Sequence, residues 1–131
     1  MAKSYMGAVG IPVTDLDASA AFFTSILGMV ELQTIEIDVM KQVVLGFEGV
    51  RGPSVLLMSY TDGRDVDCKD NPMKLVFYVP DIVAAVETAR SADYSIDTEP
   101  TPVAALGGAL VAFVKDPDGY RIELVQKAPK K

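Results

Sequence analysis

The chain has 131 residues, half of them hydrophobic, and a formal net charge of −6. This length fits one domain, and the apolar content argues against intrinsic disorder. The acidic charge disfavours nucleic acid as a partner, because its phosphates would be repelled. No apolar run is long enough to cross a membrane, and the first residues lack the apolar core of a secretion signal. We therefore expect a soluble, cytoplasmic protein with no nucleic-acid partner and no membrane partner.

Two residue types limit the chemistry of any active site. The chain contains no histidine. This excludes Ser-His and Cys-His nucleophile pairs, His-ligated zinc and the iron site of two histidines and one carboxylate. Its single cysteine, Cys68, excludes an internal disulfide and suits a reducing compartment.

The first half of the chain has the pattern of a strand, a helix and three further strands. Residues 3–13 alternate as a strand, and Thr14 or Asp15 caps a helix that ends at Gly28. Strand patterns follow at about 30–37, 43–47 and 54–60. Residues 61–72 are polar and acidic; a calcium loop would need glycine where Asp70 stands, so the pattern favours a solvated linker.

The second half repeats this order. A strand is predicted at 73–79, a helix from Asp81 to about 91 and a short strand at 96–98, followed by a loop containing Pro100 and Pro102. Strands on both sides of the turn at 116–119 then form a hairpin. Glu123 lies on the otherwise apolar flank of the last strand, where a carboxylate is costly unless a charge or hydrogen bond compensates it. Glu123 is therefore the first candidate for function.

The repeat has a fixed spacing. The pattern that begins at Val13 recurs 66 residues later at Val79, and the same spacing carries Leu57 onto Glu123. This predicts a single domain, residues 1–131, made of two β-α-β-β-β units at about 3–61 and 72–127, joined by the acidic linker. We expect an α+β fold whose mixed sheet curves around a cleft, with the sheet face away from the helices lining that cleft.

Three segments resemble those of the vicinal oxygen chelate superfamily: V-x-D-L-D at 13–17, L-G-M at 27–29 and F-V-x-D-P-D-G-Y-x-I-E-L at 113–124. That superfamily includes glyoxalase I, bleomycin resistance proteins, methylmalonyl-CoA epimerase, fosfomycin resistance enzymes and extradiol dioxygenases. The resemblance implies the glyoxalase/bleomycin resistance fold and a homodimer. In the metal-dependent members it places the four metal ligands at positions equivalent to Ala8, Leu57, Lys74 and Glu123.

Of these four positions, only Glu123 offers a metal ligand. Ala8 and Leu57 have no donor atom, and Lys74 is a cation that would repel a metal ion. We therefore expect no metal and no cofactor, and neither metal-dependent glyoxalase I nor dioxygenase activity.

Lys74 and Glu123 remain as candidate catalytic residues. Two roles are open for them. In the first, the two residues form a structural ion pair that replaces the metal. In the second, Lys74 binds an anionic ligand, and Glu123 orients that ligand or acts as a base. A Schiff base on Lys74 is the weaker alternative. By alternation, further candidate ligand-binding residues share the faces of these positions: Leu57, Ser59, Val76, Tyr78 and Arg121.

The favoured interpretation is a metal-free protein of the bleomycin resistance type that binds a small-molecule ligand near Lys74 and Glu123. One alternative is a lyase or isomerase that acts without metal on a small oxygenated substrate through the same two residues. Another is a dimeric accessory protein with no ligand. The pattern leaves open which ligand is bound and whether the cleft is formed by one chain or shared by two.

Overall fold

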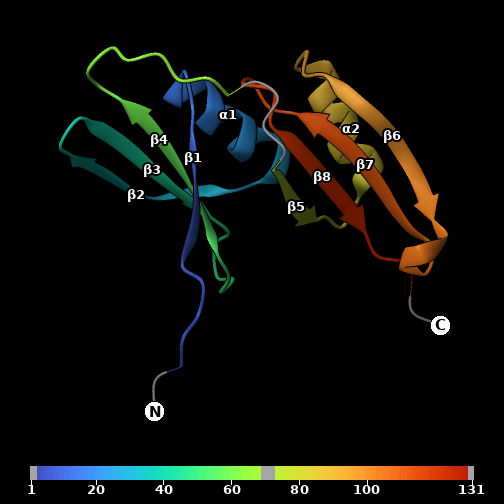
Figure 1. Cartoon of the computed structure of the whole chain (residues 1–131). Coiled ribbons are helices and arrows are strands. Elements are labelled where there is room, and N and C mark those ends of the chain that lie inside the picture. Colours follow the sequence, from blue (N-terminus) through green and yellow to red (C-terminus); the bar gives the residue numbers. More distant parts are fainter. Residues whose placement is uncertain (1–2, 69–72, 130–131) are drawn as a thin grey trace. The chain divides into compact units, whose positions relative to one another are not determined.

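The computed structural model describes residues 3–68 and 73–129. The chain divides into two compact units, Met1–Cys68 and Lys69–Lys131. Each unit contains a four-stranded mixed sheet and an α-helix, as Figure 1 shows. The α+β class and the repeated order of elements expected from the sequence are confirmed. No helix in the described ranges is both long and apolar enough to span a membrane.

Unit 1 follows the order strand, helix, three strands. Its elements are β1 (Ala8–Pro12), α1 (Leu16–Leu27), β2 (Val30–Ile37), β3 (Met40–Gly46) and β4 (Ser54–Tyr60). The strands lie in the order β1-β4-β3-β2. β1 and β4 are parallel, and the other neighbours are antiparallel.

Unit 2 has the same topology. Its elements are β5 (Lys74–Tyr78), α2 (Ile82–Ser91), β6 (Ile96–Val103), the short 3-10 helix η1 (Ala104–Leu106), β7 (Ala109–Lys115) and β8 (Arg121–Gln126). The strands lie in the order β5-β8-β7-β6, and again only the first pair is parallel.

Both α-helices begin at an aspartate. Asp15, not Thr14, is the N-cap of α1, and its Oδ1 accepts a hydrogen bond of 3.0 Å from the backbone N–H of Ala18. Asp81 caps α2 through an equivalent 3.0 Å bond from the N–H of Ala84. Each bond satisfies a backbone donor that has no partner inside the helix. Gly28 ends α1 with a φ of 74°, a conformation that glycine adopts without steric cost.

Each helix covers one face of its own sheet. α1 contacts β3 and β4, and Phe22 and Phe23 on it are fully buried, as are Leu45 and Leu57 on the strands. In unit 2, α2 contacts β6, β7 and β8, with a similar set of buried aliphatic side chains. Burying each large apolar side chain contributes about 1.5–3 kcal/mol. We call the other surface of each sheet, turned away from its helix, the open face.

Three strand boundaries differ from the sequence-based expectation. β3 begins at Met40, three residues earlier than expected. Lys3 to Gly7 contain no regular structure, so the first strand begins only at Ala8. Conversely, β6 continues through Pro100 and Pro102, which the sequence had suggested to be a loop. β6 is the edge strand of its sheet and its pairing with β7 shifts register twice, between Ile96 and Thr101. An edge strand with bulges tolerates proline because the missing N–H need not join the ladder.

The segment after β4 contains no helix or strand as far as it is described, to Cys68. Arg64 forms an ion pair of 2.6 Å with Asp62 and lies over the ring of Tyr60. The position that argued against a calcium loop, Asp70, lies outside the described residues.

Candidate functional site

The turn at 116–119 sets the direction in which Glu123 points. Asp116 Oδ1 accepts backbone hydrogen bonds from Asp118 at 3.0 Å and from Tyr120 at 2.8 Å, and Gly119 closes the turn with a φ of 88°. β8 begins two residues after Gly119. Ile122 and Leu124 are fully buried on the helix side of β8, so the alternation of the strand turns Glu123 to the open face.

Asp116 itself is nearly buried, and its Oδ2 has no hydrogen-bond partner in the part of the chain that the structure describes. Burial raises the pKa of Asp116 to about 6, while the backbone hydrogen bonds from Tyr120, Asp118 and Gly119 act in the opposite direction. Because its other oxygen holds the turn together, we assign Asp116 a structural role.

Glu123 forms an ion pair with Lys74. Lys74 Nζ lies 2.7 Å from Glu123 Oε1, and the two side chains are 50% and 10% exposed. The parallel register of β5 and β8 pairs Val76 with Glu123 and Lys74 with Arg121, so the lysine reaches diagonally across to the carboxylate. The result is a carboxylate in the interior of the unit whose charge is balanced by an ammonium at the surface.

Phe113 and Arg121 complete this group. Phe113 is paired with Glu123 across β7 and β8. The guanidinium carbon of Arg121 lies 4.2 Å from the centre of the Phe113 ring, and Lys74 Nζ lies 5.8 Å from the same centre. Two cations thus flank one aromatic ring beside the carboxylate. We call Lys74, Phe113, Arg121 and Glu123 the unit 2 cluster.

The sequence placed three members of this cluster on one face but not Phe113. Alternation along residues 109–115, matched against β8, could have indicated it. Val76 and Tyr78, the other predicted ligand-binding residues of this unit, also lie on the open face, on edge strand β5. Tyr78 is 66% exposed, and Lys127 Nζ lies 5.0 Å from the centre of its ring.

In unit 1 the two predicted ligand-binding residues lie on the other side of the sheet. β1 pairs Ala8 with Ser54 and Gly10 with Leu56. Ala8 and Lys74 are 66 residues apart, whereas their partners Ser54 and Arg121 are 67 apart. Along the chain, the two parallel strands of unit 2 are therefore one residue further apart than those of unit 1. A shift of one residue reverses the face of the sheet on which a strand residue lies.

Because of this shift, Leu56 rather than Leu57 has the place in its sheet that Glu123 has in unit 2. Leu57 is fully buried on the face that α1 covers, and Ser59 follows it by alternation. Neither residue shares the open face with Ala8.

The residues of the open faces do not fit a divalent metal ion. In unit 1, Ala8, Gly10 and Leu56 offer no donor atom on this face. In unit 2, the Glu123 carboxylate is already paired with an ammonium. Throughout the described ranges, no group of three or more His, Cys, Asp or Glu residues could hold a metal ion. We therefore assign no chemical step to a metal.

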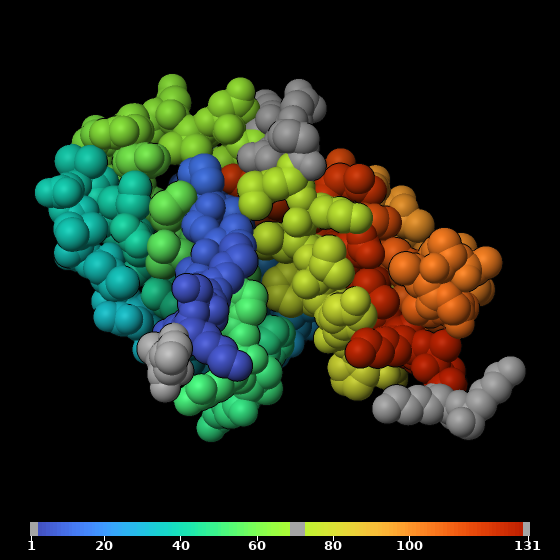
Figure 2. Space-filling model, turned by 60° about the horizontal axis from the view of Figure 1, so that its bottom comes forward, coloured from blue at the N-terminus to red at the C-terminus, as the bar shows by residue number. Residues whose placement is uncertain are grey.

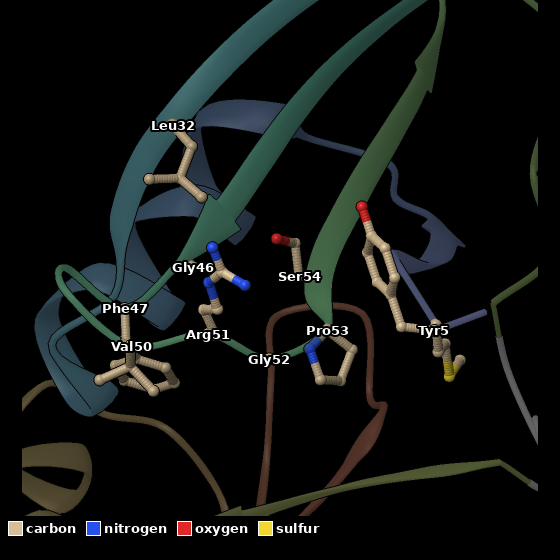
Figure 3. Close-up of a pocket in the computed structure, with 10 residues that line it drawn as sticks. Tyr5, Leu32, Gly46, Phe47, Val50, Arg51, Gly52, Pro53 and Ser54 are labelled. Carbon is tan, nitrogen blue, oxygen red and sulfur yellow. The ribbon is translucent and has the colours of Figure 1, made fainter. Parts of the chain in front are cut away.

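A pocket of about 740 Å³ lies on unit 1. Figure 3 shows its walls, formed by the N-terminal segment, the end of β3, the loop that follows and the start of β4. Its lining residues are Tyr5, Met6, Leu32, Gly46, Phe47, Val50, Arg51, Gly52, Pro53 and Ser54. The backbone N–H of Ser54 donates a 2.9 Å hydrogen bond to the carbonyl of Gly7. Figure 2 shows the blue N-terminal segment against the green chain that leads into β4. No pattern in the sequence indicates this pocket.

Comparison with known proteins identifies relatives over nearly the whole chain. The family model for the Glyoxalase/Bleomycin resistance protein/Dioxygenase superfamily matches residues 5–124. A probable lactoylglutathione lyase of Vibrio cholerae is 36% identical over 117 residues, which are 87% of this chain and 84% of that protein. A lactoylglutathione lyase of Arabidopsis thaliana is 34% identical over 89% of this chain, but the match spans only 42% of that longer protein.

Solved structures agree with the fold. The glyoxalase I of Leishmania major superposes with a TM-score of 0.81 at 30% identity, over 95% of this chain and 88% of that one. TnmS3, an antibiotic binding protein from Streptomyces, has a TM-score of 0.76 at 19% identity, over 98% of this chain and 99% of that one. At that identity the likeness concerns the fold alone.

These relatives contradict the interpretation of the chain as a metal-free small-molecule-binding protein of the bleomycin resistance type. The curated relatives at 33–36% identity are named lactoylglutathione lyases, which are enzymes. That interpretation relied on the missing donor atoms at Ala8 and Leu57. The absence of donor atoms at these two positions argues against metal binding. It does not show that the Glu123 carboxylate is catalytically inactive.

Proposed function

This chain belongs to the Glyoxalase/Bleomycin resistance protein/Dioxygenase superfamily, and from that membership we propose that it is an enzyme of the lactoylglutathione lyase type. Its substrate would be a small thioester of a 2-hydroxy acid, or the thiol and 2-oxoaldehyde from which that thioester forms. The observation that carries the proposal is the buried carboxylate of Glu123, held at 2.7 Å by the ammonium of Lys74. The names of the curated relatives support it.

The reaction requires a group that moves a proton. When a lactoyl thioester is cleaved into a thiol and a 2-oxoaldehyde, the hydrogen on the hydroxyl-bearing carbon shifts to the carbonyl carbon. The carbon–sulfur bond then breaks, and the hydroxyl proton passes to the sulfur. A carboxylate can take up the carbon-bound proton and return it to the neighbouring carbon. Glu123 suits this role because its strand holds it rigidly and the surrounding residues shield it from water.

Lys74 would stabilise the intermediate. Removal of the carbon-bound proton leaves negative charge on a substrate oxygen, and a fixed cation beside that oxygen lowers the barrier. Half of the Lys74 side chain is exposed, so its ammonium can meet a substrate oxygen while it remains close to Glu123. Phe113 and Arg121 bound the same space and limit the access of water.

The test is the formation of lactoylglutathione from methylglyoxal and glutathione by purified protein, with and without added Ni²⁺ or Zn²⁺. Glu123→Gln should reduce the rate by about 100-fold or more, because the amide cannot take up a proton. Glu87→Gln is the matched control, since Glu87 is an exposed carboxylate paired with Arg90 on α2. A wild-type protein inactive under both conditions, or a fully active Glu123→Gln variant, would overturn the proposal.

We also propose that the chain forms a homodimer and works in the cytoplasm. The edge strand β5 exposes Val76 and Tyr78 on the open face, and exposed apolar groups on an edge strand favour association. The free thiol of Cys68 is compatible with a reducing compartment.

A further inference from the structure

The pocket of unit 1 contains a single charged side chain, that of Arg51. The other lining residues include no carboxylate, and most are apolar. Figure 3 shows the Arg51 side chain rising from the loop between β3 and β4, with the hydroxyl groups of Ser54 and Tyr5 beyond it. One end of the pocket is therefore positive and rich in hydrogen-bond donors, although the chain as a whole carries a charge of −6.

Arg51 differs from the other three arginines of the sequence. Arg64 pairs with Asp62, Arg90 pairs with Glu87 and Glu99, and Arg121 lies 3.8 Å from Asp97. Arg51 has no ion-pair partner in ranges 3–68 and 73–129. In an acidic protein, an arginine without a carboxylate partner in a pocket is free to bind an external anion.

Part of the pocket wall is apolar and accessible. Leu32, Phe47 and Val50 belong to this wall and are at least one-third exposed. Gly46 lies at its base: a Cβ atom there would come within 2.6 Å of Leu32 Cδ1, so glycine gives Leu32 its room. A cluster of exposed apolar side chains in a concavity is typical of a site that binds an apolar group.

From these features we infer that the pocket binds a small amphipathic organic acid, with its carboxylate or sulfonate on Arg51 and its apolar body against Leu32, Phe47 and Val50. For the proposed enzyme, this would be an acidic part of its substrate, and that extension rests on the proposed function. Recognition of the acid itself does not depend on catalysis, and binding alone can test it.

Two dyes that share one ring system separate the charge from the apolar contact. Anilinonaphthalene sulfonate is an anion, and N-phenylnaphthylamine is its uncharged counterpart; both fluoresce more strongly in apolar surroundings. For the anionic dye, Arg51→Gln should weaken binding by about tenfold or more, because a charge-assisted hydrogen bond is lost. Binding of the uncharged dye should change little. Lys41→Gln, which removes an exposed cation of the same unit outside the pocket, should leave both affinities unchanged.

Equal weakening of both dyes by Arg51→Gln, or no effect on either, would overturn the inference. So would a change in sedimentation mass that parallels the change in dye affinity, because the pocket would then be an interface between two chains. If the dye results hold while the protein does not form lactoylglutathione, the anion site stands and only the proposed reaction is rejected. If the protein is active and Arg51→Gln leaves anionic dye binding intact, only the anion site is rejected.

Discussion

Lys74 and Glu123 lie on neighbouring parallel strands, and their charged atoms are 2.7 Å apart. The environment of the pair is asymmetric, because the carboxylate is largely buried and half of the lysine side chain is exposed. Loss of the lysine would therefore leave a buried charge without a partner, whereas loss of the glutamate would leave an ammonium that water can reach.

We predict that Lys74→Met lowers the free energy of unfolding by about 1–3 kcal/mol near neutral pH, because the charge of Glu123 stays buried without its partner. The double variant Lys74→Met/Glu123→Leu should recover most of this loss, because both charges are then gone. Urea denaturation of the wild type, both single variants and the double variant measures the coupling. If Lys74→Met alone is as stable as the wild type, the ion pair does not stabilise the fold, and the role of Lys74 is not structural.

The stability of the protein should also depend on the ionisation of Asp116. Burial raises the pKa of this carboxyl to about 6 in the folded chain, above the value of 3.8 for an exposed aspartate. The folded state therefore holds the proton more tightly than the unfolded state does. The contribution of Asp116 to stability is fully present below pH 3.8 and is lost as the pH rises through about 6. Its size is on the order of 2–3 kcal/mol.

Other carboxylates titrate in the same range, so the test is a difference between two proteins. Asp116→Asn keeps an oxygen that can accept the backbone hydrogen bonds of the turn, but it has no charge to bury. The free energy of unfolding of the wild type, relative to that of Asp116→Asn, should decrease as the pH rises from about 4 to about 6. A difference that stays constant across this range would show that Asp116 titrates normally.

Much of this architecture could be predicted from short local patterns. The helix caps, the glycine that ends α1 and the alternation around Glu123 follow from local backbone chemistry. The structure has Asp81 and Gly28 where the sequence placed them, and of the two candidates for the first cap, Thr14 and Asp15, it has Asp15. The side chain of Glu123 was expected to need a charged partner, and Lys74 supplies it.

The register of the strands and the pocket could not be predicted in the same way. The spacing of 66 residues holds for the first strand and the helix of each unit, but one extra residue in unit 2 moves Leu57 and Ser59 to the helix side. No local property of these residues signals that shift, because Leu56 and Leu57 are equally apolar. The pocket around Arg51 is formed by segments that are far apart in the sequence. The spacing of residues along the chain does not indicate that these segments lie together.

A homodimer should have about twice the 14.0 kDa mass of the chain. If the exposed edge of β5 takes part in association, Val76→Lys should weaken it, because the new charge would be buried between chains. Val83→Lys is the control, since Val83 is a comparably exposed valine on α2. Light scattering at micromolar concentration would give the masses, and a wild-type protein with the mass of one chain would contradict the prediction.

Divalent metals should bind weakly to the unit 2 cluster. The ammonium of Lys74 repels a metal cation and is paired with Glu123, the only carboxylate of the cluster. Added Zn²⁺ should therefore leave the melting temperature of the wild type nearly unchanged. Lys74→His replaces the ammonium by an imidazole that can bind zinc, so this variant should show a larger rise in melting temperature. A stoichiometric metal in wild-type protein purified without chelator, coordinated by Glu123, would show the electrostatic argument to be wrong.

Gly46→Ala should narrow the pocket of unit 1 without unfolding the chain. The new methyl group would come within 2.6 Å of Leu32 Cδ1, which is the end of a flexible and mostly exposed side chain. Leu32 can therefore move aside at a cost of about 1 kcal/mol or less in the free energy of unfolding. Its displacement should weaken the binding of both naphthyl dyes by a similar factor, because the apolar wall is disturbed and Arg51 is not. This uniform loss differs from the selective loss expected for Arg51→Gln. Unchanged affinity for both dyes in Gly46→Ala would mean that neither dye contacts Leu32, and that the apolar part of the site lies elsewhere.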